Sequence, residues 1–85
     1  MEDMIKYDLK SIVNKIETST NQTAYLSTKL DEEYIIGNVD TTDLEELGFT
    51  ILYTSNDCGV KTPIYRYGNI EAIYVGQLLH VYKIA

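Results

Sequence analysis

Seven carboxylates fall within one short stretch of this chain, and they are the residues best suited to electrostatic work. Residues 31–46 contain no Lys, Arg or His, and their acids are Asp31, Glu32, Glu33, Asp40, Asp43, Glu45 and Glu46. The rest of the chain carries six acids and seven bases, so this one stretch accounts for the whole net charge of −6. Such a negative surface can imitate nucleic-acid phosphates or dock on a basic groove of a partner protein.

The acids of this stretch differ in how well local structure explains them. Asp40 to Glu46 fall where a short helix is expected to begin, and carboxylates stabilise the first turn of a helix by capping it and by opposing its dipole. Asp31, Glu32 and Glu33 have no such explanation if they lie in a turn. We therefore predict a partner-binding site at these three acids and include two further residues of the same stretch, which are Tyr34 and Glu46.

Cys58 and His80 are the other pair that could do chemistry, because a thiolate needs a base beside it. Cys58 falls in an expected turn and His80 in mid-strand, with no third group placed to orient the imidazole. The chain also lacks a phosphate loop, a dinucleotide fingerprint and a nucleophile elbow. We therefore expect no enzyme activity, no catalytic residue and no cofactor.

Metal binding is not expected either. One Cys and one His are too few soft ligands for a structural zinc site. A calcium loop needs acidic or amide ligands at alternate positions around a Gly, whereas Gly37 follows Tyr34, Ile35 and Ile36.

The chain holds eight Tyr and one Phe, and most of the Tyr fall in expected strands. Tyr65 and Tyr67 point to one face of a strand, and Arg66 points to the other. Cross-strand Tyr ladders are a usual structural device, but Tyr and Arg also dominate binding hot spots. Both interpretations stay open, and Tyr65 and Tyr67 are included in the predicted partner site. Direct nucleic-acid binding is not expected, because the chain has no cluster of basic residues.

The first half of the chain predicts one clear helix and one ambiguous region. Residues 2–18 form an amphipathic helix whose apolar face is Ile5, Leu9, Ile12, Val13 and Ile16. Residues 24–29 alternate as a strand does, and residues 31–36 would then be a helical turn or the return strand of a hairpin. The alternative is a second helix through Tyr34 that ends at Gly37. The sequence does not decide between a hairpin and a helix for residues 24–39.

The second half predicts a short helix followed by a meander of strands. Asp40 or Thr41 caps the helix and Gly48 ends it. Four strand-like runs follow at residues 49–55, 60–67, 70–75 and 78–84, and Gly68-Asn69 and Gly76-Gln77 suit type II′ hairpin turns. Pro63 requires a local edge, a bulge or a later strand start. The predicted fold is α+β, with an N-terminal amphipathic helix and a short second helix packed on an antiparallel, mainly meander sheet of about four to five strands.

Length and composition bound what remains. Eighty-five residues are enough for a single domain, residues 1–85. No apolar run is long enough for a transmembrane helix, and the acidic N-terminus does not resemble a signal peptide. We therefore expect a cytoplasmic protein that does not bind membranes.

The order of elements over residues 12–54, including YLSTKL and the run from Leu44 to Ile51, resembles small helix–strand–helix–strand proteins encoded by phages and other mobile elements of AT-rich bacteria. Residues 31–42 have no counterpart in that pattern. The resemblance implies an accessory protein that acts in a bacterial host cell by binding a host or phage protein. Small acidic members of that group include inhibitors of nucleic-acid-handling defence enzymes.

The function expected from the sequence is binding without catalysis. The chain would be an acidic inhibitor or adaptor that occupies a basic, nucleic-acid-binding surface of a partner protein. Two alternatives stay open: a homo-oligomeric structural or virion accessory protein, and a small-molecule or nucleotide-binding module.

Overall fold

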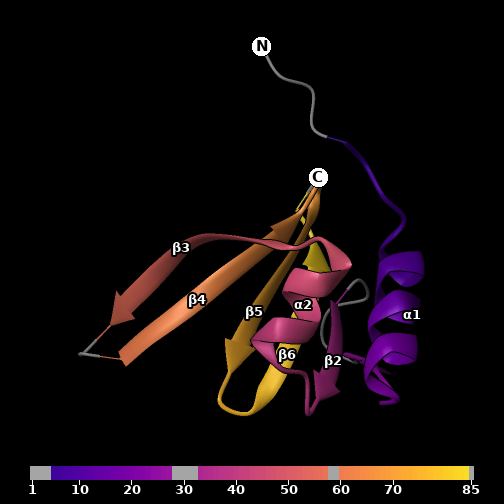
Figure 1. The fold of residues 1–85 in the computed structure, drawn as a ribbon, viewed down its shortest axis with the longest axis horizontal. Coiled ribbons are helices and arrows are strands. Elements are labelled where there is room, and N and C mark those ends of the chain that lie inside the picture. Colours follow the sequence, from indigo (N-terminus) through magenta and orange to yellow (C-terminus); the bar gives the residue numbers. More distant parts are fainter. Residues whose placement is uncertain (1–4, 28–32, 58–59, 85) are drawn as a thin grey trace.

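A computed structural model shows two helices packed on a six-stranded antiparallel sheet (Figure 1). It describes residues 5–27, 33–57 and 60–84, with the backbone alone for residues 53–57 and 60–62. The elements in chain order are α1 (Leu9–Thr20), β1 (Tyr25–Leu26), β2 (Glu33–Gly37), α2 (Thr41–Leu47), β3 (Thr50–Asp57), β4 (Val60–Tyr67), β5 (Ile70–Val75) and β6 (Leu78–Lys83). The expected α+β fold is confirmed.

The sheet has the strand order β1-β2-β6-β5-β4-β3, and every neighbouring pair is antiparallel. Strands β3 to β6 form the expected meander, and β2 adds beside β6. The connection from β2 to β3 therefore crosses the sheet, and α2 lies in this connection. The strand count is six rather than four to five because the ambiguous region forms the hairpin β1–β2, in which Tyr25 pairs with Ile35 and Leu26 with Tyr34. The helix alternative is wrong for residues 25–26 and 33–37.

Both helices cover the same face of the sheet, and the core lies between the two layers. Alternate residues of the strands point into it, as the two-residue period of a strand requires. The buried apolar residues of the core are Leu9, Ile12, Val13, Ile16, Ile36, Val39, Leu44, Phe49, Tyr65, Ile70, Ala72, Leu79 and Val81. The opposite face of the sheet carries no helix in the part of the chain that the structure describes. We call this the open face.

Helix α1 begins at Leu9, later than the pattern of apolar residues predicts. Asp8 has an extended backbone, and its side chain accepts a hydrogen bond from Ser11 N at 3.2 Å, so it is the N-cap. Ile5 was expected on the buried helix face, but it lies before the helix and is 64% exposed. The prediction of a helix over residues 5–8 is therefore wrong, and residues 1–4 lie outside the described residues.

Helix α2 follows the sequence prediction closely. Asp40 is its N-cap, and the Asp43 carboxylate accepts a hydrogen bond from Asp40 N at 3.1 Å. Gly48 ends the helix with φ +107, in the left-handed region where a Cβ is strained. Just before the helix, the Tyr74 hydroxyl donates to the Val39 carbonyl at 2.6 Å and holds the start of α2 against the sheet.

The turn at Gly68-Asn69 ties the start of the chain to the sheet. Asn69 is 1% exposed, and its side chain accepts from Tyr7 N at 2.6 Å and donates to Tyr7 O at 3.3 Å. At Gly68, with φ +59, a Cβ would lie 2.5 Å from the Ile5 carbonyl oxygen, so no other residue fits without a shift. The positive φ falls on Gly68 and Gly76 and not on the residue after each, as the expected type II′ turns require.

Pro63 marks the point where the sheet narrows. It pairs with Thr54 of β3, whereas the pairing of β4 with β5 starts one residue later, at Ile64. Strand β4 is therefore a local edge at Pro63, where the missing N–H has no ladder to interrupt. This was one of the three arrangements expected from the sequence.

Candidate functional site

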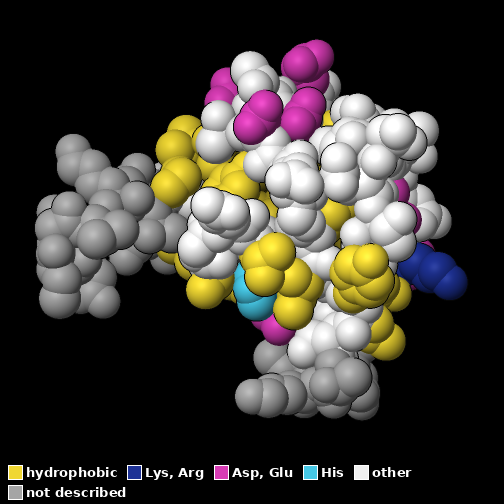
Figure 2. Space-filling model, turned by 90° about the horizontal axis from the view of Figure 1, so that it is seen from below, with side chains coloured by type: hydrophobic (Ala, Val, Ile, Leu, Met, Phe, Trp, Pro, Cys, Tyr) yellow, Lys and Arg dark blue, Asp and Glu magenta, His cyan; other side chains and the backbone are white. Residues whose placement is uncertain are grey.

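The acidic stretch is divided among several elements. Asp40, Glu45 and Glu46 are exposed on α2 or at its cap, and Asp43 is half-buried in the capping box. No ion pair joins any of these four to a base among the described residues. Figure 2 shows several Asp and Glu side chains gathered along one margin of the molecule, and others beside the His and beside the dark blue basic side chain. The predicted sites Asp31 and Glu32 lie outside the described residues.

Glu33, which was predicted to bind a partner, is not part of this free acidic surface. It lies on β2, on the open face of the sheet, and its Oε2 is 3.4 Å from Nδ1 of His80 on the neighbouring strand β6. Both side chains are about four-fifths covered. The Glu33 carboxylate is thus mostly covered beside the His80 ring, so a partner can reach it less well than it can reach the exposed acids of α2.

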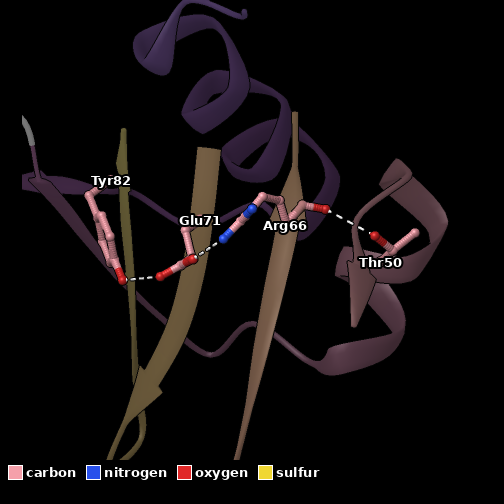
Figure 3. Close-up of polar contacts among 4 residues, drawn as sticks. All are labelled: Thr50, Arg66, Glu71 and Tyr82. Atoms are coloured by element: carbon pink, nitrogen blue, oxygen red, sulfur yellow. Dashed lines mark hydrogen bonds and ion pairs between the residues drawn. The ribbon is translucent and has the colours of Figure 1, made fainter. Parts of the chain in front are cut away.

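Beside that pair, a second polar group crosses the open face (Figure 3). Arg66 Nη2 of β4 donates to Glu71 Oε2 of β5 at 2.8 Å, and the Tyr82 hydroxyl of β6 donates to Glu71 Oε1. On the outer side, Thr50 Oγ1 of β3 donates to the Arg66 carbonyl at 3.4 Å. The Glu71 carboxylate thus joins β4, β5 and β6, and the Thr50 hydroxyl links β3 to the backbone of β4.

The electrostatics of this group follow from its position. Burial of Glu71 opposes ionisation, but the hydrogen bonds from Tyr82 and Arg66 and the Arg66 charge outweigh it, so the pKa of Glu71 lies below its ordinary value. The Nε of Arg66 is buried and has no hydrogen-bond partner among the described residues. The Glu71 charge is compensated by Arg66 within the sheet, whereas the acids of α2 have no such ion pair among the described residues.

Sequence reasoning missed this group, although a signal for it exists. A two-residue turn at Gly68-Asn69 places Tyr67 opposite Ile70, and so Arg66 opposite Glu71. Oppositely charged residues directly across a ladder stabilise the sheet. The pair could have been found by counting outward from the turn.

The tyrosines predicted to form a contact surface lie on the wrong face for that role. Tyr65 and Tyr67 do share a face, with Arg66 on the other, but it is the face that the helices cover. Tyr65 is 3% exposed, so almost none of its side chain is accessible to a partner in this structure. The Tyr67 ring packs 4.6 Å from the Tyr7 ring and 5.2 Å from Phe49, between centroids.

The remaining predicted site residues are Tyr34, on the sheet face that the helices cover, and Glu46. Tyr34 is half-buried and packs against the core, whereas Glu46 stays exposed on α2. Cys58 lies outside the described residues, so the Cys58–His80 pairing is not tested. Among residues 5–27, 33–57 and 60–84, no group of three or more His, Cys, Asp or Glu could hold a metal ion. Within the same ranges no helix is long and apolar enough to cross a membrane.

Comparison of the chain with models of protein families, with curated proteins and with solved structures finds no match. Any functional proposal must therefore come from the arrangement of the residues themselves. Of the predicted site residues that the structure describes, Glu46 alone is both charged and exposed, and it lies beside Glu45 on α2.

Proposed function

We propose that this protein is a non-catalytic binding module that uses the acids of α2 to engage a basic surface of a partner protein. The observation that supports the proposal most is the difference between α2 and the open face. On the open face Glu71 pairs with Arg66 and Glu33 is mostly covered beside His80, whereas Glu45 and Glu46 are exposed with no ion-pair partner among the described residues.

Two of these acids have no structural task that would explain them. Asp40 and Asp43 form the capping box of α2, and their position is accounted for by helix stability. Glu45 and Glu46 lie past the first turn, where a carboxylate no longer gains from the helix dipole. Their charges are thus available to a Lys- or Arg-rich surface. A groove that normally binds nucleic acid is the class of partner surface that such charges fit.

The test is an affinity pull-down from bacterial lysate, washed with increasing salt, using variants matched in net charge. Glu45→Gln/Glu46→Gln and Asp31→Asn/Glu32→Gln each raise the net charge by two. The control, Thr23→Lys/Gln77→Lys, raises the net charge by the same amount at two exposed positions outside α2.

We expect the wild type to retain a partner at low salt and to release it as salt rises, because exposed charge pairs are screened. Each exposed ion pair contributes about 0.2–1 kcal/mol, so the Glu45/Glu46 variant should weaken binding by about 2-fold to 30-fold. The control should bind as the wild type does. Equal loss in the control and the Glu45/Glu46 variant, or capture that salt does not change, would contradict the proposal.

A further inference from the structure

Strand β3 is a long edge strand, and its pairing with β4 is interrupted by a register shift between Ile51 and Tyr53 and is regular from Tyr53 to Asp57. It is the last strand of the sheet, eight residues long, whereas the strand at the other edge, β1, has two residues. Residues 50–56 contain no charged residue and no Pro, although 24% of the chain is charged. Proteins commonly protect such edges with Lys, Pro or a very short strand, because unpaired backbone groups accept a further strand.

The outer half of β3 also extends beyond the support of the sheet. Its pairing with β4 continues through Thr54–Pro63 to Asp57–Val60, while β5 pairs with β4 only from Ile64 onward. Figure 1 shows this end of the β3–β4 hairpin reaching away from the helices and the other strands. A two-stranded ribbon is marginally stable alone in water, and a third strand would stabilise it.

A third strand can add to only one edge of the β3–β4 hairpin. On the β4 side, Pro63 has no N–H to donate, which disfavours strand addition there. On the β3 side, nothing in the sequence of residues 50–56 prevents it. Two side chains at the start of this edge, Ile51 and Leu52, are 55% and 45% exposed, and a further strand would cover them.

We infer that the outer edge of β3 pairs with β3 of a second copy of this chain, which gives a symmetric dimer with one continuous antiparallel sheet. Charge supports a second copy as the occupant. A two-fold axis normal to the sheet at Thr54 would pair Thr54 with itself and Tyr53 with Ser55, and it would place Asp57 near Ile51, so no two like charges meet across the pair. The strand has one charge, Asp57 at its end, and residues 50–56 have none with which to attract a charged peptide. Two-fold pairing also closes the assembly at two copies, because both long edges are then used.

The dimer is tested by sedimentation equilibrium over about 1–500 µM protein, a range that measures micromolar dissociation constants. Leu52→Lys adds a charge to the β3 edge. Val75→Lys is the matched control, because Val75 is 56% exposed and lies on β5, away from that edge. Both variants replace one exposed apolar residue by Lys, and circular dichroism checks that each folds.

We expect a concentration-dependent dimer whose dissociation constant rises about ten-fold or more in Leu52→Lys, since two apolar contacts are lost per dimer and two charges are added. Val75→Lys should leave it within about two-fold. A protein that is monomeric at every concentration would overturn the inference. So would an equal effect of Val75→Lys, which would indicate association through the open face instead.

Single-cysteine variants give a second measurement that does not depend on the folding of Leu52→Lys. In a Cys58→Ser background, Tyr53→Cys, Thr54→Cys or Ser55→Cys on β3 should form disulfide dimers in a glutathione buffer. Thr62→Cys on the facing strand β4 should not. Dimers formed equally by Thr62→Cys, or by none of the β3 variants, would refute pairing through β3.

Salt separates this inference from the proposed function. Two molecules that each carry −6 repel each other, so raising NaCl from about 50 to about 500 mM should tighten the dimer. The same change should weaken binding of a basic partner to α2. Glu45→Gln/Glu46→Gln should weaken only the latter, so either proposal can fail without the other.

Discussion

The side chain of Asn69 is predicted to be a principal anchor of this small protein. It is 1% exposed in a turn, and its two hydrogen bonds reach the backbone of Tyr7, 62 residues away in the chain. Asn69→Ala removes an acceptor 2.6 Å from Tyr7 N and a donor 3.3 Å from Tyr7 O. The methyl group that replaces the amide cannot satisfy either backbone group.

The cost can be worked out from the two groups left behind. A buried polar group without a partner costs about 1–3 kcal/mol, and the lower half of that range applies here because these contacts are only partly buried. At about 1–2 kcal/mol each, two such groups give a loss of about 2–4 kcal/mol. A domain of this length has a total stability of roughly 4–13 kcal/mol, so the loss is a substantial fraction of it. At about 4–8 °C for each kcal/mol, the melting temperature should fall by about 8–32 °C.

Urea and thermal unfolding followed by circular dichroism measure the destabilisation of Asn69→Ala, and Gln77→Ala is a matched control. Gln77 occupies the equivalent position of the next hairpin turn but is exposed, so Gln77→Ala should change stability by less than about 0.5 kcal/mol. Hydrogen exchange should show faster exchange of the Tyr7 amide in Asn69→Ala. If Asn69→Ala is as stable as Gln77→Ala, the docking of residues 5–8 does not stabilise the fold, and the reasoning is refuted.

Three further predictions concern single sites. Gly68→Ala should destabilise the protein more than Gly76→Ala. Both glycines have positive φ, but only at Gly68 would a Cβ lie 2.5 Å from a carbonyl oxygen. Gly76→Ala should cost about 1–2 kcal/mol from its φ alone. Because the pKa of Glu71 is lowered in the folded protein, its ionisation should stabilise the fold above the ordinary pKa of 4.5. This stability should be lost as pH falls through the lower pKa of the folded state. Unfolding free energies at a series of pH values measure the loss. Burial raises the pKa of Tyr74 to about 12 from 10.0, so stability should fall as pH rises between these values, in step with a late-titrating tyrosine in ultraviolet absorbance.

Each of these three predictions has a control variant that tests the physical cause given for it. For the glycines, equal losses in both variants would show that the close approach to Ile5 has no cost. For Glu71, Glu71→Gln should flatten the acid part of the pH profile, and an unchanged profile would contradict the assignment. For Tyr74, Tyr74→Phe should abolish the alkaline loss, since it removes the hydroxyl that donates to Val39.

Local chemistry explains why some elements could be predicted from the sequence and others could not. Helix α2 was predicted with its ends because Asp40 and Gly48 act on their immediate neighbours. The start of α1 was not, because Ile5 continues the apolar spacing of the helix. What holds residues 5–8 outside the helix is the cap at Asp8 and a contact with Asn69 that no local pattern reveals.

In the sheet and the candidate site, too, features set by neighbouring residues could be predicted, whereas features set by distant contacts could not. Alternation correctly placed Tyr65 and Tyr67 on one face, but it cannot say which face the helices will cover. Strand β1 has two residues, too few for alternation to appear, and the identity of β2 depends on β6, which lies more than forty residues later. Register from a short turn, by contrast, was available in the sequence and would have paired Arg66 with Glu71.

The fold also changes where the electrostatic function must be sought. The sequence pointed to Asp31, Glu32 and Glu33 because the acids of α2 had a local explanation. In the structure Glu33 has its own partner, His80, and the explanation for α2 holds only for Asp40 and Asp43. Glu45 and Glu46 lie beyond the capping box, are exposed, and have no base beside them among the described residues. If a basic partner binds this protein, the second turn of α2 is therefore the first place where loss of charge should be felt.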